Sequence, residues 1–391
     1  MKTEIYSTLF ILGCTLVGCG DKERNQAQDT ETVENYAQIV LANYEDTYEG
    51  ALQMQETIHD FLLSPTASGL AQSKKAWLQA RESYGQTEAF RFYGGPIDDE
   101  NGPEGQINAW PLDEAYIDYV ANGGETTNAN IINSPISYPE ITFELIASLN
   151  ENGSETNVSS GYHAIEFLLW GQDLTDGPGG GERPFTDFVA GENGTADHQV
   201  RRATYLKEVT KLLVSDLGSL VKAWSLDQNN YRKQFIATPE QSLSDIIAGL
   251  GKLSKGELAG ERIFVAYDLQ SKEDEHSCFS DNTHRDIYTN ALGIENVFLG
   301  NYQRIDGTLI RGRSIYDLLQ SENEVLADEI KVLIAESVAA CAAIQPPFDQ
   351  EFNTADGRVR ISKAISLLRK QGDKLAEASK VFGFKFNPED I

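Results

Sequence analysis

The residues best suited to catalysis or metal binding lie in the stretch 160–170, where His163 and Glu166 interrupt an otherwise apolar run. At about 100° per residue in a helix, His163, Glu166 and Trp170 share one face, while Ile165 lies on the opposite face. A helix that is apolar on both sides is enclosed by protein, and an ionised carboxylate there loses solvation worth roughly several kcal/mol unless it is paired, hydrogen-bonded or coordinated. The pair therefore needs partners, and a metal ion is one candidate.

A second polar segment, 273–286, holds two more of the five histidines of the chain among acidic and hydroxyl side chains. Imidazole and carboxylate ligands together suit zinc, iron or manganese, so this segment could complete a site that the His163 helix begins. Composition alone favours another interpretation, a solvated loop in which Asp, Ser and Asn cap neighbouring helices. The residues that could act as ligands or support them are Glu273, His276, Asp281 and His284.

A third constellation, 87–98, combines Glu88 and Arg91 with the later Asp98 among aromatic residues. Glu88 and Arg91 are spaced i,i+3 and can form a salt bridge on one helix face, which is the expected role of Arg91. Glu88 could instead turn toward a polar pocket shared with the other constellations.

Helices must position these residues, because apolar residues recur at helical spacing between Gly, Pro and Asn clusters and alternating strand-like runs are scarce. The chain is predicted to be all-α, with long helices and short turns that favour bundles. A polar stretch after Trp224 predicts a boundary between an N-terminal bundle, 33–225, and a C-terminal bundle, 226–391. The expected helices span 33–63, 68–92, 111–120, 138–149, 160–170, 197–224, 242–251, 256–269, 314–344 and 357–382.

The first residues indicate export and lipid anchoring. Residues 1–18 contain Lys2 followed by a short apolar run, which is typical of a signal peptide and too short to span a bilayer. The tetrapeptide Leu16-Val17-Gly18-Cys19 resembles a bacterial lipobox, which predicts cleavage before Cys19 and its acylation. Residues 19–32 are polar and are expected to form a tether. The expected location is the bacterial cell envelope, with a lipid anchor in the outer membrane, facing the periplasm or the cell surface.

Beyond the signal and the acylated residue, the remaining cysteines are Cys278 and Cys341. In an oxidising compartment they could form a disulfide, or both could be unpaired and buried, and their spacing does not decide between these.

The formal net charge is −28, from 60 acidic and 32 basic residues. Such a surface repels nucleic acid and could concentrate cations, although an acidic surface also serves solubility alone. No nucleic-acid partner is expected.

Six blocks in order resemble the imelysin family, and the similarity extends over most of the chain from about Val33. The family signature Gly-x-His-x-x-Glu falls on Gly161, His163 and Glu166. The resemblance implies two helical-bundle domains with the motif residues near their interface. It also brings a peptidase label and links to iron regulation and iron uptake. The blocks are 87–92, 95–98, 110–114, 161–173, 256–262 and 273–284.

These observations lead to the expectation of an exported lipoprotein that binds a metal ion, with iron expected, or an iron-containing ligand, in acquisition or delivery and with an iron-transport partner. The metal ligands are expected among His163, Glu166, Glu88, His276 and His284, and the supporting residues are Arg91, Asp98, Glu273, Asp281 and Arg262. One alternative is a zinc metallopeptidase of the same family, and another is a binding protein for a small organic or peptide ligand. Whether the protein is an enzyme stays open, because the chain lacks His-Glu-x-x-His and shows no local general base.

Overall fold

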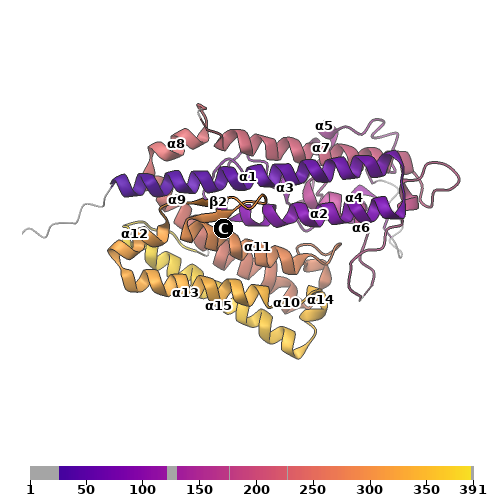
Figure 1. The fold of residues 1–391 in the computed structure, drawn as a ribbon. Coiled ribbons are helices and arrows are strands. Elements are labelled where there is room, and N and C mark those ends of the chain that lie inside the picture. The colour runs from indigo at the N-terminus through magenta and orange to yellow at the C-terminus, as the bar shows by residue number, and fades with distance from the viewer. Residues whose placement is uncertain (1–25, 121–129, 176, 227, 389–391) are drawn as a thin grey trace, which may run out of the picture.

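A computed structural model describes residues 26–120, 130–175, 177–226 and 228–388, and within these ranges the protein is all-α apart from one short hairpin, which confirms the expected fold class. Three long helices build the N-terminal half: α1 (Gln26–Leu63), α2 (Ala67–Thr87) and α7 (Gln199–Trp224). The first packs against both others, and all three lie in the upper half of Figure 1. The short helix α6 (Gly161–Trp170) contacts α2 and α7 and carries the His163/Glu166 pair.

The C-terminal half is a second group of helices. Helix α9 (Pro239–Lys252) continues through the π-helical segment η3 (Leu253–Phe264) into α10 (Val265–Leu269). Against this long element pack α15 (Ala355–Val381) and α11 (Thr283–Leu299), and α13 (Glu324–Ala342) packs on both of these.

Shorter elements connect the long helices. Strands β1 (Asn301–Gln303) and β2 (Leu309–Arg311) pair antiparallel, with Tyr302 opposite Ile310. The remaining short helices are η1 (Glu88–Phe90), α3 (Glu104–Ile107), α4 (Glu114–Ile117), α5 (Phe143–Leu149), η2 (Phe185–Phe188), α8 (Tyr231–Ala237), η4 (Lys272–Asp274), α12 (Ile315–Glu322) and α14 (Phe348–Glu351).

The two halves meet where α2 packs on α11 and α1 packs on α9. Two glycines permit the close approach of α2 and α11. A Cβ at Gly85 would stand 2.0 Å from Oγ1 of Thr289, and one at Gly293 would stand 2.4 Å from the carbonyl oxygen of Gln86. One hydrophobic core cluster includes residues of both halves. The division into domains 33–225 and 226–391 therefore stays a prediction.

Several helix boundaries differ from the expectation. Helix α1 begins at Gln26, so the last part of the predicted tether is helical, because Asp29 and Thr32 are buried there. Helix α9 does not end at Gly251. That glycine instead gives room to the ring of Phe386, which would lie 2.5 Å from a Cβ. The expected helix 314–344 is interrupted at Asn323, whose side chain caps α13. The expected helix 111–120 shrinks to Glu114–Ile117.

Cys278 and Cys341 are free thiols among the described residues, and a disulfide between them stays a prediction. Cys341 is buried near the end of α13, and Cys278 is half-buried in the loop before α11. Burial raises the pKa of the Cys341 thiol to about 12, so it stays protonated and chemically inert. The predicted signal peptide and Cys19 lie outside the described residues.

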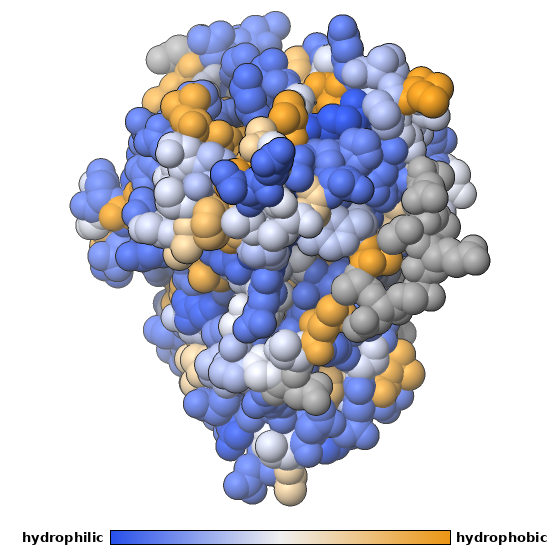
Figure 2. All heavy atoms as spheres, turned by 90° about the vertical axis from the view of Figure 1, so that its right-hand side faces the viewer, coloured by the Kyte–Doolittle hydropathy of each residue, from blue (hydrophilic) through white to orange (hydrophobic). Residues whose placement is uncertain are grey.

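The surface in Figure 2 is mostly hydrophilic, with hydrophobic patches that are small and separate. Within the described ranges, no helix combines the length and apolarity needed to cross a membrane.

Candidate functional site

The site is organised by helix α6, whose ten residues are all buried. Its first residue must be glycine, because Gly161 has φ +80° and a Cβ there would stand 2.4 Å from the carbonyl oxygen of Ile107. The i,i+3 spacing brings Nδ1 of His163 to 2.9 Å from Oε2 of Glu166. The helix therefore holds both side chains of the signature in mutual contact inside the protein.

Glu166 has its second partner in the C-terminal half. Its Oε1 accepts hydrogen bonds from the backbone N–H and the hydroxyl of Ser280, at 2.9 and 2.7 Å. Burial nevertheless raises the pKa of Glu166 to about 8 and lowers the pKa of His163 to about 3. Near neutral pH the pair is therefore uncharged overall.

A second imidazole lies beside the first. The ring centroids of His163 and His276 are 4.7 Å apart, and the rings meet edge to face. Nδ1 of His276 is 2.8 Å from Oδ2 of Asp286, and its Nε2 is 3.4 Å from Nδ2 of Asn108. Burial lowers the pKa of His276 to about 3, so this imidazole is neutral as well. Since the carboxylate fixes the hydrogen on Nδ1, Nε2 of His276 is an acceptor.

Asp286 is held ionised by a cation from the other half. Nη2 of Arg81 lies 3.0 Å from Oδ1 of Asp286, and the hydroxyl of Ser277 also donates to this carboxylate. Burial alone would raise the pKa of Asp286, but Arg81 and His276 hold it well below the usual range. A Trp110 ring packs edge-on against His276, with centroids 5.2 Å apart.

Glu88 is enclosed by arginines rather than left free. Its Oε2 accepts from Arg262 at 2.8 Å and from Arg91 at 2.7 Å, and Nδ2 of Asn108 lies 3.3 Å from its Oε1. Although burial would raise its pKa, Arg262 and Arg91 lower the pKa of Glu88 to about 2. Arg262 comes from the π-helical segment η3, so a break in regular helix places it in the cluster.

The structure thus brings together six of the predicted residues: His163, Glu166, His276, Glu88, Arg91 and Arg262. The other four lie outside this cluster. Asp98 caps the backbone of Phe92 and Gly95, Asp281 accepts from Gly179 and Gly180, His284 contacts the carbonyl of Asp281, and Glu273 lies in the short helix η4.

The solvated-loop interpretation of 273–286 is wrong. Glu275, His276 and Asp286 are at most 2% exposed, and α11 begins at Thr283 within the segment. Burial of Ser280 and Asp286 is compensated by bonds to the other half of the protein, to Glu166 and Arg81 respectively.

Sequence reasoning missed the residues that complete the network: Arg81, Asn108, Ser280 and Asp286. Arg81 had a usable signal, since a charged residue in an Ala- and Gly-containing helix needs a buried partner when the helix packs on both sides. Ser280 contributes its backbone N–H, which no sequence pattern marks.

No three His, Cys, Asp or Glu side chains in the described part of the chain are arranged to hold a metal ion. The donor set fits a metal only in part. Among the described residues Nε2 of His163 is buried without a hydrogen-bond partner, whereas the carboxylates of Glu88 and Asp286 are occupied by arginines. The metal-ligand atom left unoccupied in this cluster is therefore a histidine ring nitrogen.

Comparisons with known proteins agree with this architecture. The family model described as Imelysin matches residues 40–375. A protein named iron-regulated protein A, from Synechococcus elongatus, is 27% identical over 382 residues, which is 93% of this chain and 90% of that protein.

Two crystal structures share the fold. One is a candidate iron-regulated protein A precursor from Parabacteroides distasonis, with a TM-score of 0.70 and 18% identity, covering 93% of this chain and 97% of that one. The other is an imelysin-like protein from Psychrobacter arcticum, with a TM-score of 0.65 and 15% identity, covering 93% and 98%. Because the family model matches most of the sequence, the chain belongs to the imelysin family.

Proposed function

We propose that the protein is a lipoprotein of the bacterial cell envelope that binds a metal ion, with iron expected, or an iron-containing ligand, for acquisition or delivery. The observation that carries this proposal is that both imidazoles of the site have a carboxyl group at Nδ1, Glu166 behind His163 and Asp286 behind His276. A partner at Nδ1 orients a metal-binding histidine, and an ionised partner, as Asp286 is behind His276, also increases its basicity. This arrangement leaves each Nε2 facing away from its carboxyl partner.

The Nε2 atoms of His276 and His163 differ in whether a hydrogen-bond partner lies near them. Nε2 of His276 has the amide of Asn108 at 3.4 Å, a long contact, and Nε2 of His163 has no hydrogen-bond partner in the part of the chain that the structure describes. An unpaired buried nitrogen costs roughly 1–3 kcal/mol, and a bound cation would offset that cost. Both rings are neutral near pH 7, which is the form that binds metals. In this proposal Glu166 orients His163 rather than binding the ion directly.

Two donors do not complete a site, so the remaining ligands come with the cargo or from side chains that turn. An iron chelate would supply its own oxygen ligands, which accords with a role in handling an iron-containing ligand. Iron here is cargo, and the protein residues bind, orient and shield it.

Binding is favoured over hydrolysis by the state of the carboxylates. A zinc peptidase needs a carboxylate free to act as general base toward water. Glu88 and Asp286 are both ion-paired with arginines, and Glu166 bonds His163 and Ser280. Peptidase activity is therefore tested as an alternative, and metal binding is the preferred function.

The proposal includes anchoring through acylated Cys19, an outer-membrane location and a transport partner that receives the metal. The lipobox-like sequence and the name of the iron-regulated relative support these points. The charge of −28 supports the absence of a nucleic-acid partner.

The decisive experiment is calorimetric titration of the metal-stripped full-length chain with Fe²⁺, Fe³⁺, ferric citrate and Zn²⁺, with elemental analysis of the complexes. His163→Ala is expected to weaken iron binding at least about 100-fold, since it removes the free donor. The matched control is His59→Ala, an exposed histidine on α1. If iron binds equally to wild type and His163→Ala, the proposal is wrong. Peptide hydrolysis that requires zinc and His163 would establish the metallopeptidase alternative. If a metal-free organic or peptide ligand copurifies with wild type but not with His163→Ala, the protein is the small-ligand binding protein of the second alternative.

A further inference from the structure

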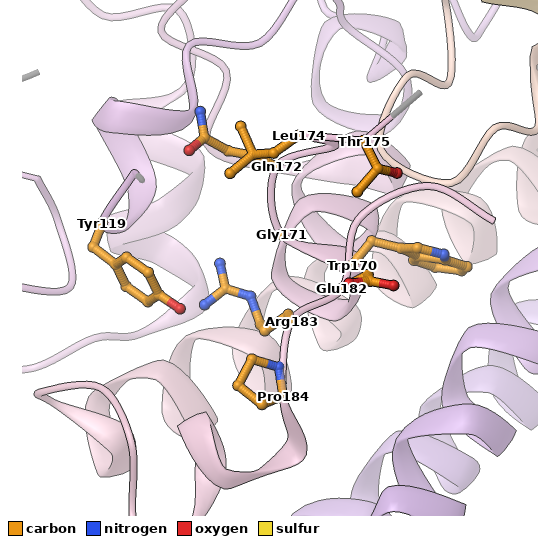
Figure 3. Close-up of a pocket in the computed structure, with 9 residues that line it drawn as sticks. All are labelled: Tyr119, Trp170, Gly171, Gln172, Leu174, Thr175, Glu182, Arg183 and Pro184. Atoms are coloured by element: carbon orange, nitrogen blue, oxygen red, sulfur yellow. The ribbon is translucent and has the colours of Figure 1, made fainter. Parts of the chain in front are cut away.

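A cavity of about 210 Å³ lies at the other end of α6, where the helix stops at Trp170. Its lining includes Tyr119, Trp170, Thr175 and Arg183. In Figure 3 the Tyr119 side chain points toward the Arg183 guanidinium, whereas the Trp170 side chain points away from it. At roughly 30 Å³ for each water in the liquid, the volume suits a molecule of fewer than about ten non-hydrogen atoms. None of these residues belongs to the cluster around His163.

Arg183 is the feature that gives this cavity a chemical preference. Its side chain is 2% exposed, and Nη1 of the guanidinium reaches Asp118 at 2.8 Å and Asp187 at 3.3 Å. Nε of the same group is buried and has no hydrogen-bond partner in the described part of the protein. Nε and Nη2 form the edge of a guanidinium that binds a carboxylate side-on through two parallel hydrogen bonds. The structural ion pairs therefore use Nη1 and leave a donor of the carboxylate-binding edge available.

The backbone of Gly171 lies close to Arg183, and the lack of a side chain there avoids crowding Nε. Gly171 ends α6 with φ +72° and ψ −168°, a backbone conformation that residues other than glycine rarely adopt. A Cβ at Gly171 would stand 3.3 Å from Cβ of Arg183 and 3.6 Å from its Nε. The N–H of Arg183 bonds the carbonyl of Trp170 at 2.7 Å, which fixes the two segments relative to each other.

The charges around Arg183 balance within the protein, but they leave its Nε without a partner. Asp118 also pairs with Arg202, whose Nε lies 2.6 Å away, whereas Arg202 bonds Asp187 at its backbone carbonyl, at 2.9 Å. Asp187 therefore pairs its carboxylate with Arg183 alone of these two arginines. A further cation, Lys74, lies over the Trp170 ring at 5.2 Å from its centroid. Burial and the proximity of Arg183 lower the pKa of Lys74 to about 8, so these two cations repel each other. The exposed Glu182 at the lining is the nearby opposing charge.

We propose that this cavity binds a small carboxylate, held by the Nε edge of Arg183, with Lys74 contributing attraction and the Tyr119 and Trp170 side chains forming the walls. The site is independent of the metal-binding proposal. It assigns a function to the Trp170-Gly171-Gln172 sequence directly after the signature, which the His163 cluster does not use.

The test is calorimetric titration of the full-length chain with sodium acetate, alongside sodium phosphate and sodium chloride. Wild type is expected to bind acetate with a Kd of about 1 mM or tighter. Arg183→Lys keeps a positive charge for Asp118 and Asp187 but loses the planar edge, so acetate binding should weaken at least about tenfold.

A second variant keeps the proposal testable if Arg183→Lys does not fold. Lys74→Gln removes a half-buried surface cation and should weaken acetate binding roughly threefold. Lys75→Gln is the matched control, because Lys75 is the exposed neighbour on the same helix, and it should bind acetate like wild type. His163→Ala should also leave acetate binding unchanged, which separates this site from the metal site.

Three results would overturn the proposal. The first is the absence of saturable acetate binding. The second is equal acetate affinity in wild type, folded Arg183→Lys and Lys74→Gln. The third is saturable binding of phosphate without acetate, which would assign the cavity to a different class of anion.

Discussion

The two ends of α6 resemble each other in burial and differ in what they leave unpaired. Around His163, imidazoles and carboxyl groups meet in an enclosed cluster, in which Nε2 of His163 has no hydrogen-bond partner among the described residues; Nε of Arg91 in this cluster is also unpaired there. Around Arg183, guanidinium and carboxylate groups meet beside a cavity, and within the described ranges the N–H donor Nε of Arg183 has no partner. Most buried charges at both ends are satisfied by ion pairs, which specify the fold. Nε2 of His163 and Nε of Arg183 have opposite preferences, the first for a cation and the second for an anion.

The largest effect is expected from Asp286→Asn, which disrupts the His163 end alone. The change leaves the buried Arg81 guanidinium without its carboxylate, and the single amide oxygen of asparagine cannot serve both Arg81 and His276 as the two carboxylate oxygens do. Removing one partner of a buried ion pair costs about 3–5 kcal/mol in the free energy of unfolding. Chemical denaturation followed by circular dichroism measures this loss, while acetate binding by the folded variant should equal that of wild type. A loss below about 1 kcal/mol would show that Arg81 finds another partner and that the network is not structural.

Acid should destabilise the His163 end through its two histidines. Their folded pKa of about 3 lies below the unfolded value, so their contribution to stability is complete above about pH 6.5 and is lost as the pH falls. Each histidine contributes a slope of about 1.4 kcal/mol per pH unit on the acid side. Glu166 acts in the opposite direction, since its raised pKa means that stability is lost as the pH rises through about 8.

The measurement compares unfolding free energies at several values between about pH 4.5 and pH 8 for wild type and His163→Gln. In the variant, the slope of the unfolding free energy against pH on the acid side should correspond to about one proton fewer taken up on unfolding. The exposed control, His59→Gln, should retain the wild-type slope. If His163→Gln follows the wild-type curve, His163 is not held neutral by burial.

At the other end of α6, Gly171→Ala should act on both backbone and cavity. The positive φ of +72° makes any side chain strained, at a cost of about 1–3 kcal/mol. The added methyl group also approaches Nε of Arg183 and should weaken acetate binding several-fold, roughly, by crowding the side-on edge. Thermal denaturation and acetate titration measure the two effects, with iron binding as the internal control. Unchanged acetate affinity would place the ligand away from Arg183, and weakened iron binding would show that the two ends are coupled.

The sequence was sufficient for the features that depend on local periodicity. The all-α class, the α6 helix and the i,i+3 contact of His163 with Glu166 follow from spacing alone. The partners of those residues could not be predicted this way, because they come from distant parts of the chain. Asp286 reaches Arg81, 205 positions away, through the packing of α11 on α2, and Ser280, in the loop before α11, reaches Glu166, 114 positions away. Asp98 and Asp281 were predicted beside the metal for their carboxylates, yet both bond backbone N–H groups of turns. Turn capping and metal binding use the same residue type, so composition does not separate them.

The smallest effect is expected from Glu82→Gln, which tests whether burial rather than ion pairing itself stabilises the junction of α2 and α11. Glu82 and Arg285 are the sequence neighbours of Arg81 and Asp286 and join the same two helices through two hydrogen bonds of 2.7 and 2.8 Å. Their side chains are 44% and 38% exposed, so water competes with the bond and about 0.2–1 kcal/mol should be lost. Denaturation at low and high salt measures this, and the difference from wild type should shrink as salt is added. A loss as large as that of Asp286→Asn would mean that the helix junction, and not the enclosed environment of His163, makes the Arg81–Asp286 pair important.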